Sequence, residues 1–239
     1  MKYLNGPIQS RRLGLSLGVS LTPYKTCSFD CIYCQLGRTK YITIETKEYV
    51  PGQEILNELK NWYQANPQEA KGLSYITFSG AGEPMLNSKA GNLISRIKEV
   101  IPVPVAVITN TSLLNTPELR QALLGADLIV PSLDAVTEAV FQRINRPHPK
   151  SKLEDIINGL ISLRKEFKGR IWLEVMLVKG VNDDLGHIRK LRAVIEKINP
   201  DKIHLNSPVR VTADPDVTAV DRDKLEKIRE MLGDKCEII

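Results

Sequence analysis

The segment Tyr75-Ile-Thr-Phe-Ser-Gly-Ala-Gly-Glu-Pro84 shows the unit from which the chain is built. Its first four residues are aromatic or β-branched, and a run of this length bounded by turn residues is typical of a strand buried on both faces. Gly80 and Gly82 then end the strand in a loop that allows close backbone approach. A polar loop directly after a buried strand is characteristic of the functional edge of a parallel sheet.

The same unit recurs on both sides of this segment. Short apolar runs alternate with stretches whose apolar residues recur at intervals of three and four, which predicts alternating strands and helices. The predicted strands are 13–21, 75–78, 103–108, 128–130, 171–178 and 203–205. The predicted helices are 53–62, 93–100, 117–124, 153–167 and 187–198. Such alternation predicts an α/β fold with parallel strands, and because six units are too few for the usual eightfold closure, we expect a partial (β/α)6 barrel.

The rest of the chain adds little to this plan. Residues 222–232 predict one more helix, and the last residues a short edge strand. No linker, low-complexity tract or internal repeat interrupts the pattern, so we expect a single domain over residues 1–239. The sequence assigns no role to the final helix or to Cys236.

Composition and charge narrow the class of protein. The 239 residues are 42% hydrophobic and 26% charged, as expected of an ordinary globular protein. The net charge of +5 favours anionic partners only weakly, because the basic residues are scattered. No apolar run approaches the roughly 20 residues that span a bilayer. Arg11-Arg12 is similar to the start of an export signal, but residues 14–21 are short and rich in Gly and Ser, so we predict a strand in a cytoplasmic protein.

Three of the four cysteines, Cys27, Cys31 and Cys34, lie within one short segment. Such a trio in a chain otherwise poor in thiols indicates a metal site rather than a disulfide framework. Three thiolates on a [4Fe-4S] cluster leave one iron open, whereas the four-cysteine pattern of ferredoxins closes it. An open iron can chelate the amino and carboxylate groups of S-adenosylmethionine, whose reductive cleavage gives a 5′-deoxyadenosyl radical.

A zinc knuckle is the alternative interpretation of the trio. Cys236 or a histidine would then complete a tetrahedral site. Zinc ligands, however, usually come in short pairs, and His148, His187 and His204 each have no second ligand at such a spacing. The spacing therefore favours the cluster.

The cysteine spacing, with an aromatic residue before the third cysteine, resembles the signature of the radical S-adenosylmethionine superfamily. The resemblance implies that Tyr33 lies against the adenine of the cofactor. The loop with Gly80, Gly82 and Glu83 resembles the family's Gly-Gly-Glu-type motif, whose backbone and carboxylate hold the methionyl amino group. A packing aromatic and a plain tight turn are the alternatives for these two features.

Polar residues also follow the next two predicted strands. The resemblance implies that Asn110, Ser132 and Asp134 bind the ribose hydroxyls and the carboxylate of the cofactor. Helix capping is the alternative for each of them. Because the carboxyl ends of parallel strands meet at one edge, we expect these residues to lie near the cysteine loop. The same edge supplies three candidates for substrate contact, Lys179, Asn182 and Asn206, while no catalytic residue is assigned.

Longer motifs resemble a cytosolic group related to the tRNA wyosine-forming synthases. The matching segments are 10–14, 25–27, 34–37, 143–147, 174–178, 180–183 and 206–210. Those synthases carry a second iron-sulfur cluster on additional cysteines, which this sequence lacks. The resemblance therefore implies the chemistry of the superfamily and leaves the substrate open.

We thus expect a radical enzyme, of oxidoreductase or lyase type, that abstracts hydrogen from an unidentified substrate. The family resemblance suggests a tRNA base, and it implies an external one-electron reductant of the flavodoxin or ferredoxin type. Two alternatives stay open: an activating enzyme for a glycyl-radical protein, and a non-catalytic metal-binding module.

Overall fold

The computed structural model describes residues 1–239, which form an eight-stranded sheet, a two-stranded sheet and surrounding helices. The strands are β1 (Leu4–Ser10), β2 (Gly14–Val19), β3 (Thr26–Cys27), β4 (Tyr41–Ile42), β5 (Tyr75–Phe78), β6 (Val105–Thr109), β7 (Leu128–Pro131), β8 (Arg170–Met176), β9 (Lys202–Asn206) and β10 (Cys236–Ile238). The helices are α1 (Gly52–Ala65), α2 (Pro67–Gly72), α3 (Ala90–Val100), α4 (Pro117–Leu123), α5 (Glu138–Asn145), α6 (Leu153–Glu166), α7 (Leu185–Ile198) and α8 (Arg222–Leu232), with a 3-10 helix η1 at Pro84–Leu86.

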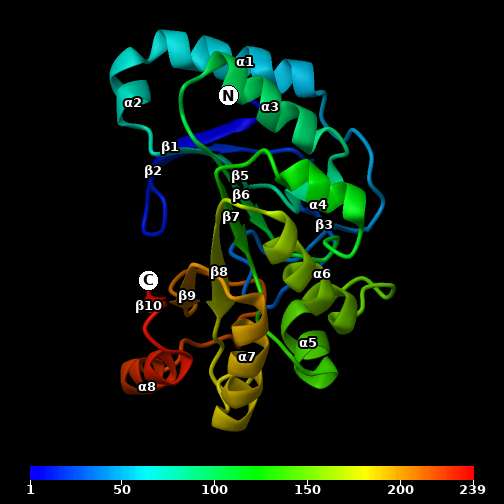
Figure 1. Ribbon diagram of the computed structural model, residues 1–239, viewed down its shortest axis with the longest axis vertical. Coiled ribbons are helices and arrows are strands. Elements are labelled where there is room, and N and C mark those ends of the chain that lie inside the picture. The colour runs from blue at the N-terminus through cyan, green and yellow to red at the C-terminus, as the bar shows by residue number, and fades with distance from the viewer.

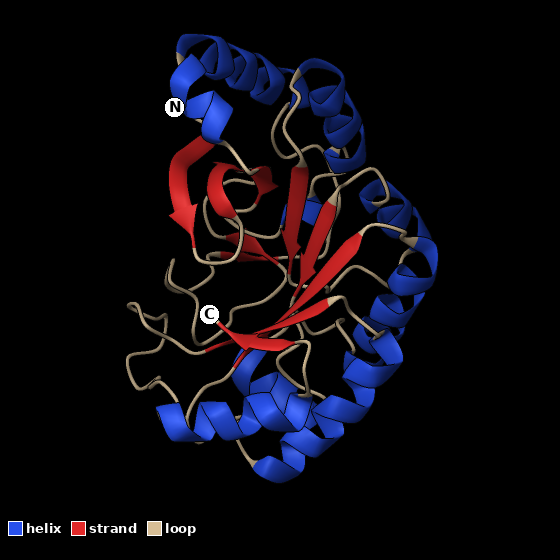
Figure 2. Cartoon of the chain, turned by 60° about the vertical axis from the view of Figure 1, so that its left-hand side comes forward, coloured by secondary structure: helices blue, strands red, loops and turns tan.

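The main sheet is open and almost entirely parallel. Its order is β1-β2-β5-β6-β7-β8-β9-β10, and only the β1–β2 pair is antiparallel. The strands curve, and the helices lie along the outer side of the curve (Figures 1 and 2). β5 and β7 are buried along their whole length. The α/β class, the parallel strands and the partial barrel are therefore confirmed.

The helices pack on the sheet through one apolar stripe each, as their sequence period requires. In α3 the stripe is Leu93, Ile94 and Ile97, all buried in the main core. Burial of each such side chain contributes roughly 1.5–3 kcal/mol relative to exposure. None of the helices combines the length and the apolar character needed to cross a membrane.

The structure differs from the sequence prediction at the amino-terminal end. The predicted strand 13–21 is β2, Gly14–Val19, and an unpredicted strand, β1, precedes it as an antiparallel edge. Gly6 and Pro7 concealed β1, because both residues are typical of turns, although an edge strand tolerates proline. The short helices α2 and α5 were also not predicted, whereas α8 and the edge strand β10 are confirmed.

The turn between β1 and β2 contains the two arginines that resemble an export signal. The Arg12 guanidinium forms a salt bridge with Glu174 of β8. Nη1 of Arg11 donates to the carbonyl of Ile239, 3.0 Å away, beyond β10. The turn beside the edge strand β1 is thus joined to β8 and to the end of β10 by arginine side chains and not by a strand ladder.

Candidate active site

The three clustered cysteines lie on a loop that begins at β3. Cys27 pairs with Ile42 of β4, and the backbone then turns, with the Cys34 amide donating to the Cys31 carbonyl at 3.1 Å. All three cysteines are half-buried, and none forms a disulfide. Burial among protein atoms, with smaller contributions from Glu83 and Cys34, raises the pKa of Cys27 to about 11. Burial likewise raises the pKa of Cys31 well above its usual range, so both thiols need a partner to ionise.

Each thiol of the trio has its own nitrogen donor. Nδ2 of Asn110 lies 3.4 Å from Sγ of Cys27. Nδ2 of Asn145 lies 3.5 Å from Sγ of Cys31. The third donor, Nζ of Lys25, lies 3.4 Å from Sγ of Cys34. The three donors come from the end of β6, the end of α5 and the segment before β3.

The three thiols do not form a site for a single metal ion. No group of three or more His, Cys, Asp or Glu side chains is packed closely enough to hold a single metal ion. A four-iron cluster is broader than one ion and is bound by thiolates at separate corners. The donor set, three thiols each facing a nitrogen donor, fits such a cluster, because hydrogen bonds to the sulfurs stabilise its charge.

The glycine loop after β5 packs directly against the base of the cysteine loop. A Cβ on Gly82 would lie 1.7 Å from the carbonyl oxygen of Thr26, so only glycine fits there. Gly80 has a φ of +106°, and a Cβ there would lie 2.6 Å from Oγ of Ser20. The Ala81 carbonyl accepts from the Lys25 amide at 2.7 Å. These contacts place the two loops side by side, as the sequence predicted.

Glu83 is buried, and its carboxylate faces the protein. It accepts hydrogen bonds from the Met85 amide at 3.0 Å, Oγ1 of Thr109 at 2.8 Å and the Asn110 amide at 2.7 Å. Burial raises its pKa to about 7, although these bonds oppose the shift. The carboxylate therefore joins the glycine loop to the end of β6.

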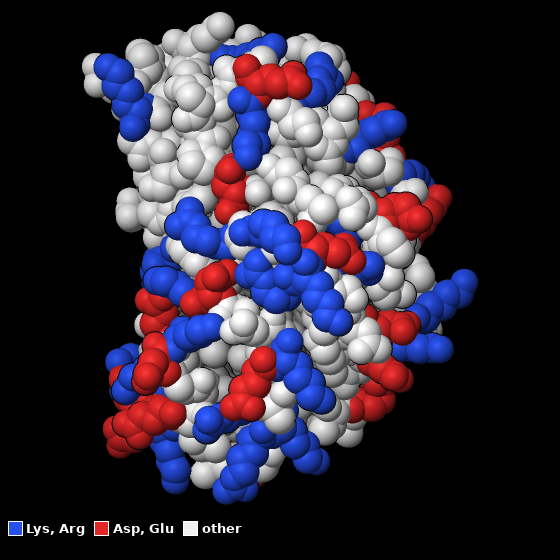
Figure 3. All heavy atoms as spheres, viewed as in Figure 1, with Lys and Arg blue, Asp and Glu red and all other residues white.

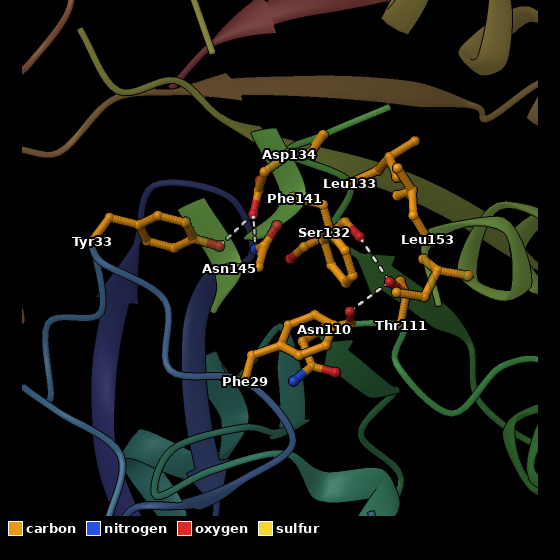
Figure 4. A pocket seen from close by; sticks show the side chains of 12 residues that line it. Phe29, Tyr33, Asn110, Thr111, Ser132, Leu133, Asp134, Phe141, Asn145 and Leu153 are labelled. Carbon is orange, nitrogen blue, oxygen red and sulfur yellow. Dashed lines mark hydrogen bonds between the residues drawn. The ribbon is translucent and has the colours of Figure 1, made fainter. Parts of the chain in front are cut away.

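Four of the predicted cofactor residues line one pocket between the cysteine loop and the ends of β6 and β7. They are Tyr33, Asn110, Ser132 and Asp134. Figure 4 shows the Tyr33 hydroxyl directed at the Asp134 carboxylate, which accepts from it at 2.5 Å. Asp134 also accepts from Nδ2 of Asn145 at 2.9 Å and from the Met176 amide at 2.9 Å. Burial raises the pKa of Asp134 to about 6.

The pocket itself is nearly filled by its own side chains. About 10 Å³ is free, room for one water molecule. A nucleoside would have to sit at the mouth, where Tyr33, Asn110 and Ser132 are partly exposed. A larger cavity, of about 530 Å³, is bordered by Ser112, Lys150 and Lys152 among others.

The sequence did not predict two residues that face the thiols, and it proposed candidate substrate contacts whose side chains are engaged elsewhere. Lys25 and Asn145 stand inside motifs that carried the family resemblance, but nothing in the sequence indicated that they face thiols. Asn182 is fully buried, and its amide is occupied by the Asp134 and Met176 carbonyls, so it does not reach a substrate. Lys179 is exposed and paired with Asp221.

The fold and the loop of three cysteines together define a class, that of partial barrels with a thiol loop at the carboxyl edge of the sheet. A family model described as the Radical SAM superfamily matches residues 21–192. The chain therefore belongs to the radical SAM superfamily, a family of enzymes that use a [4Fe-4S] cluster and S-adenosylmethionine.

Similar proteins extend this result over nearly the whole chain. A Brachyspira hyodysenteriae protein named GTPase Obg is 40% identical over 237 residues, which cover 99% of this chain and 34% of that protein. A UPF0026 protein of Methanocaldococcus jannaschii is 34% identical over 234 residues, 98% of this chain and 71% of the relative. A probable dual-specificity RNA methyltransferase RlmN of Thermotoga petrophila is 26% identical over 216 residues, 86% of this chain and 58% of the relative. This chain thus spans about one third of the Brachyspira protein.

Solved structures confirm the fold. A radical SAM methyltransferase from Sphaerobacter thermophilus superposes with a TM-score of 0.73 at 16% identity, covering 94% of this chain and 66% of that chain. Archaeal TYW1 superposes with a TM-score of 0.60 at 19% identity, covering 91% and 71% of the two chains.

Proposed function

We propose that Cys27, Cys31 and Cys34 hold the [4Fe-4S] cluster and leave one iron free for S-adenosylmethionine. The observation that carries this proposal is that each thiol of one short loop has a separate nitrogen donor at 3.4 to 3.5 Å. When bound, the cluster would supply one electron that cleaves S-adenosylmethionine, and the resulting 5′-deoxyadenosyl radical would abstract hydrogen from the substrate.

The residues around the trio would bind and orient the cofactor. Tyr33 is held in place by Asp134, so its ring can support the adenine at the pocket mouth. Ser132 presents a hydroxyl group there, suited to ribose hydroxyls and a carboxylate, while Asn110 borders the same pocket and its side-chain amide donates to Cys27 and Ser28. The glycine loop can approach the methionyl group through its backbone.

Glu83 would act mainly through other residues. Its carboxylate is taken up by three protein donors, and one of them is the amide of Asn110. This arrangement supports a positioning role for Glu83 more strongly than a direct grip on the methionyl amino group. The glycine loop and Asn110 would then be kept at a fixed separation on either side of the cofactor.

The test is reductive cleavage of S-adenosylmethionine by anaerobically reconstituted protein. With dithionite, the protein should release 5′-deoxyadenosine, measured by liquid chromatography, and Cys27→Ala, Cys31→Ala or Cys34→Ala should each abolish release and reduce the iron content. Cys236→Ala is the matched control, because this buried thiol of β10 lies outside the loop. Full iron content without cleavage, or cleavage by any loop variant, would contradict the proposal.

For the substrate, we propose an RNA base. The RNA methyltransferase relative and the resemblance to wyosine-forming synthases support this class, and the net charge of +5 is compatible with it. Charge alone does not locate an RNA surface, because Lys and Arg on the face shown in Figure 3 are interspersed with Asp and Glu.

Binding of unmodified tRNA at increasing salt tests the substrate class. An RNA-binding protein that contacts several phosphates should lose affinity steeply, with a linear dependence of log K on log salt. Affinity should fall by at least about tenfold between 50 and 200 mM salt if a few phosphates are contacted. A flat response would instead indicate a small molecule or a peptide.

A further inference from the structure

Lys25 is a buried cation without a carboxylate. The residue is 3% exposed, and it takes part in none of the salt bridges of the molecule. Its Nζ contacts Sγ of Cys34 at 3.4 Å and the carbonyl of Gly37. Burial of an ammonium is costly unless an anion faces it, and of the two groups that Nζ contacts only the Cys34 thiol can become an anion.

The backbone of Lys25 fixes this orientation. Its φ is +61°, a left-handed conformation that a long side chain rarely adopts. The Lys25 amide donates to the Ala81 carbonyl at 2.7 Å, and its own carbonyl accepts from the amides of Lys40 and Tyr41, both at 3.1 Å. Both the glycine loop and β4 therefore hold Lys25 in this unfavourable conformation, and such strain is concentrated at functional sites.

The three donors around the thiols are not equivalent. Asn110 and Asn145 offer neutral amides to Cys27 and Cys31, and only Lys25 offers a charge. A hydrogen bond from an ionised donor is roughly twice as strong as a neutral one. Hydrogen bonds to sulfur also set the reduction potential of an iron-sulfur cluster.

We propose that Lys25 is the counter-ion of the cluster and raises its reduction potential through the Cys34 thiolate. The inference rests on the proposed function, since it requires a cluster on the trio. When one electron passes from the external reductant to the cluster, the reductant is oxidised and the cluster gains one negative charge. The Lys25 ammonium stabilises that added charge, while the two amides orient their thiols. Lys25 is thus a positioning and tuning residue, not one that meets the substrate.

The experiment is a redox titration of the reconstituted protein, followed by electron paramagnetic resonance. Lys25→Met keeps the length of the side chain and removes its charge, so the potential should fall. We expect the equilibrium constant for reduction to drop roughly tenfold, which for one electron is about 59 mV. Lys25→Arg should restore most of the loss. Lys40→Met is the matched control, because the Lys40 amide bonds to the Lys25 carbonyl while its side chain is exposed, and the potential of that variant should stay near wild type.

The outcomes separate this inference from the proposed function. Wild-type protein without iron would refute the function itself. If Lys25→Met binds a full complement of iron and has the same reduction potential as Lys40→Met, the proposed role of Lys25 is overturned and the proposed function is not. If Lys25→Met binds no cluster, thermal unfolding of the cluster-free proteins decides: a melting temperature at or above that of wild type supports the proposal, because an unpaired cation has been removed. A lower melting temperature would show that Lys25 is merely structural.

Discussion

Buried charge is handled differently in two regions of this molecule. At the β1–β2 hairpin, the buried carboxylate of Glu174 is paired with Arg12. Around the cysteine loop, Lys25, Glu83 and Asp134 are buried with no oppositely charged side chain in contact. The other buried charges follow the first pattern, with the pairs Asp30–Arg38, Arg120–Glu166 and Asp183–Lys224.

Folding stability alone explains the paired charges of the first region but not the unpaired charges around the cysteine loop. A buried charge pair is close to neutral for stability, whereas an uncompensated buried charge is a net cost. All three uncompensated charges lie within one network around the trio: Lys25 on a thiol, Glu83 on the Asn110 amide and Asp134 on Tyr33. Burial raises the pKa of Glu83 and of Asp134, and carboxyl groups with perturbed pKa values cluster at functional sites, so this cost coincides with the proposed cofactor site.

The largest expected effect comes from breaking the paired region. Arg12→Met should leave Glu174 buried without its partner and lower the free energy of unfolding by about 4 kcal/mol. Urea denaturation measures this. The double variant Arg12→Met with Glu174→Leu should recover most of the loss, because apolar residues can replace a buried pair. A loss under about 1 kcal/mol for the single variant would remove the distinction between the two regions.

A somewhat smaller effect is expected from Glu83, through the dependence of stability on pH. Its pKa is about 7 in the folded protein against an ordinary 4.5, so between these values the folded state binds more protons than the unfolded state. The free energy of unfolding should therefore fall as the pH rises across this window, by about 3 kcal/mol in total, and level off above it. Glu83→Gln should flatten this decline in urea denaturation of the cluster-free protein.

The control for Glu83 is Glu118→Gln, a substitution of an exposed residue on α4, which should keep the wild-type decline. Glu83→Gln would also weaken the hydrogen bonds from Thr109 and from two backbone amides. This second effect lowers the free energy of unfolding by the same amount at every pH, so it does not mask the flattening. If the free energy of unfolding falls with pH equally in Glu83→Gln and wild type, the Glu83 carboxyl group is not the source of the decline.

The sequence was sufficient to predict the alternation of strands and helices and the location of the site. Buried strands such as Tyr75–Phe78 have a local signal, a short apolar run ended by glycine, and the order of strands and helices follows from it. That Tyr33, Asn110, Ser132 and Asp134 share one pocket follows from the rule that parallel strands end at one edge.

The contacts within the site were not predictable in the same way. Asn145 reaches Cys31 across 114 positions of sequence, and Asn110 reaches Cys27 across 83. Such pairs depend on how the loops fold over the sheet, and no local pattern encodes them. The carboxylate of Glu83 was expected to face the cofactor, but which way a buried side chain turns is decided by the donors around it.

The smallest expected effect is that of Tyr33→Phe, which removes the hydroxyl that donates to Asp134 at 2.5 Å. At pH 8 the carboxylate is charged, so the loss should cost the cluster-free protein about 2 kcal/mol of unfolding free energy. The hydroxyl lowers the pKa of Asp134, which burial raises to about 6, so at pH 5 the carboxyl is mostly protonated and the cost should shrink to about 1 kcal/mol. Tyr24→Phe, which removes an exposed hydroxyl bonded to the Leu36 carbonyl, is the control and should change little at either pH. An equal cost for Tyr33→Phe at both pH values would mean that Asp134 does not titrate as an uncompensated buried carboxyl.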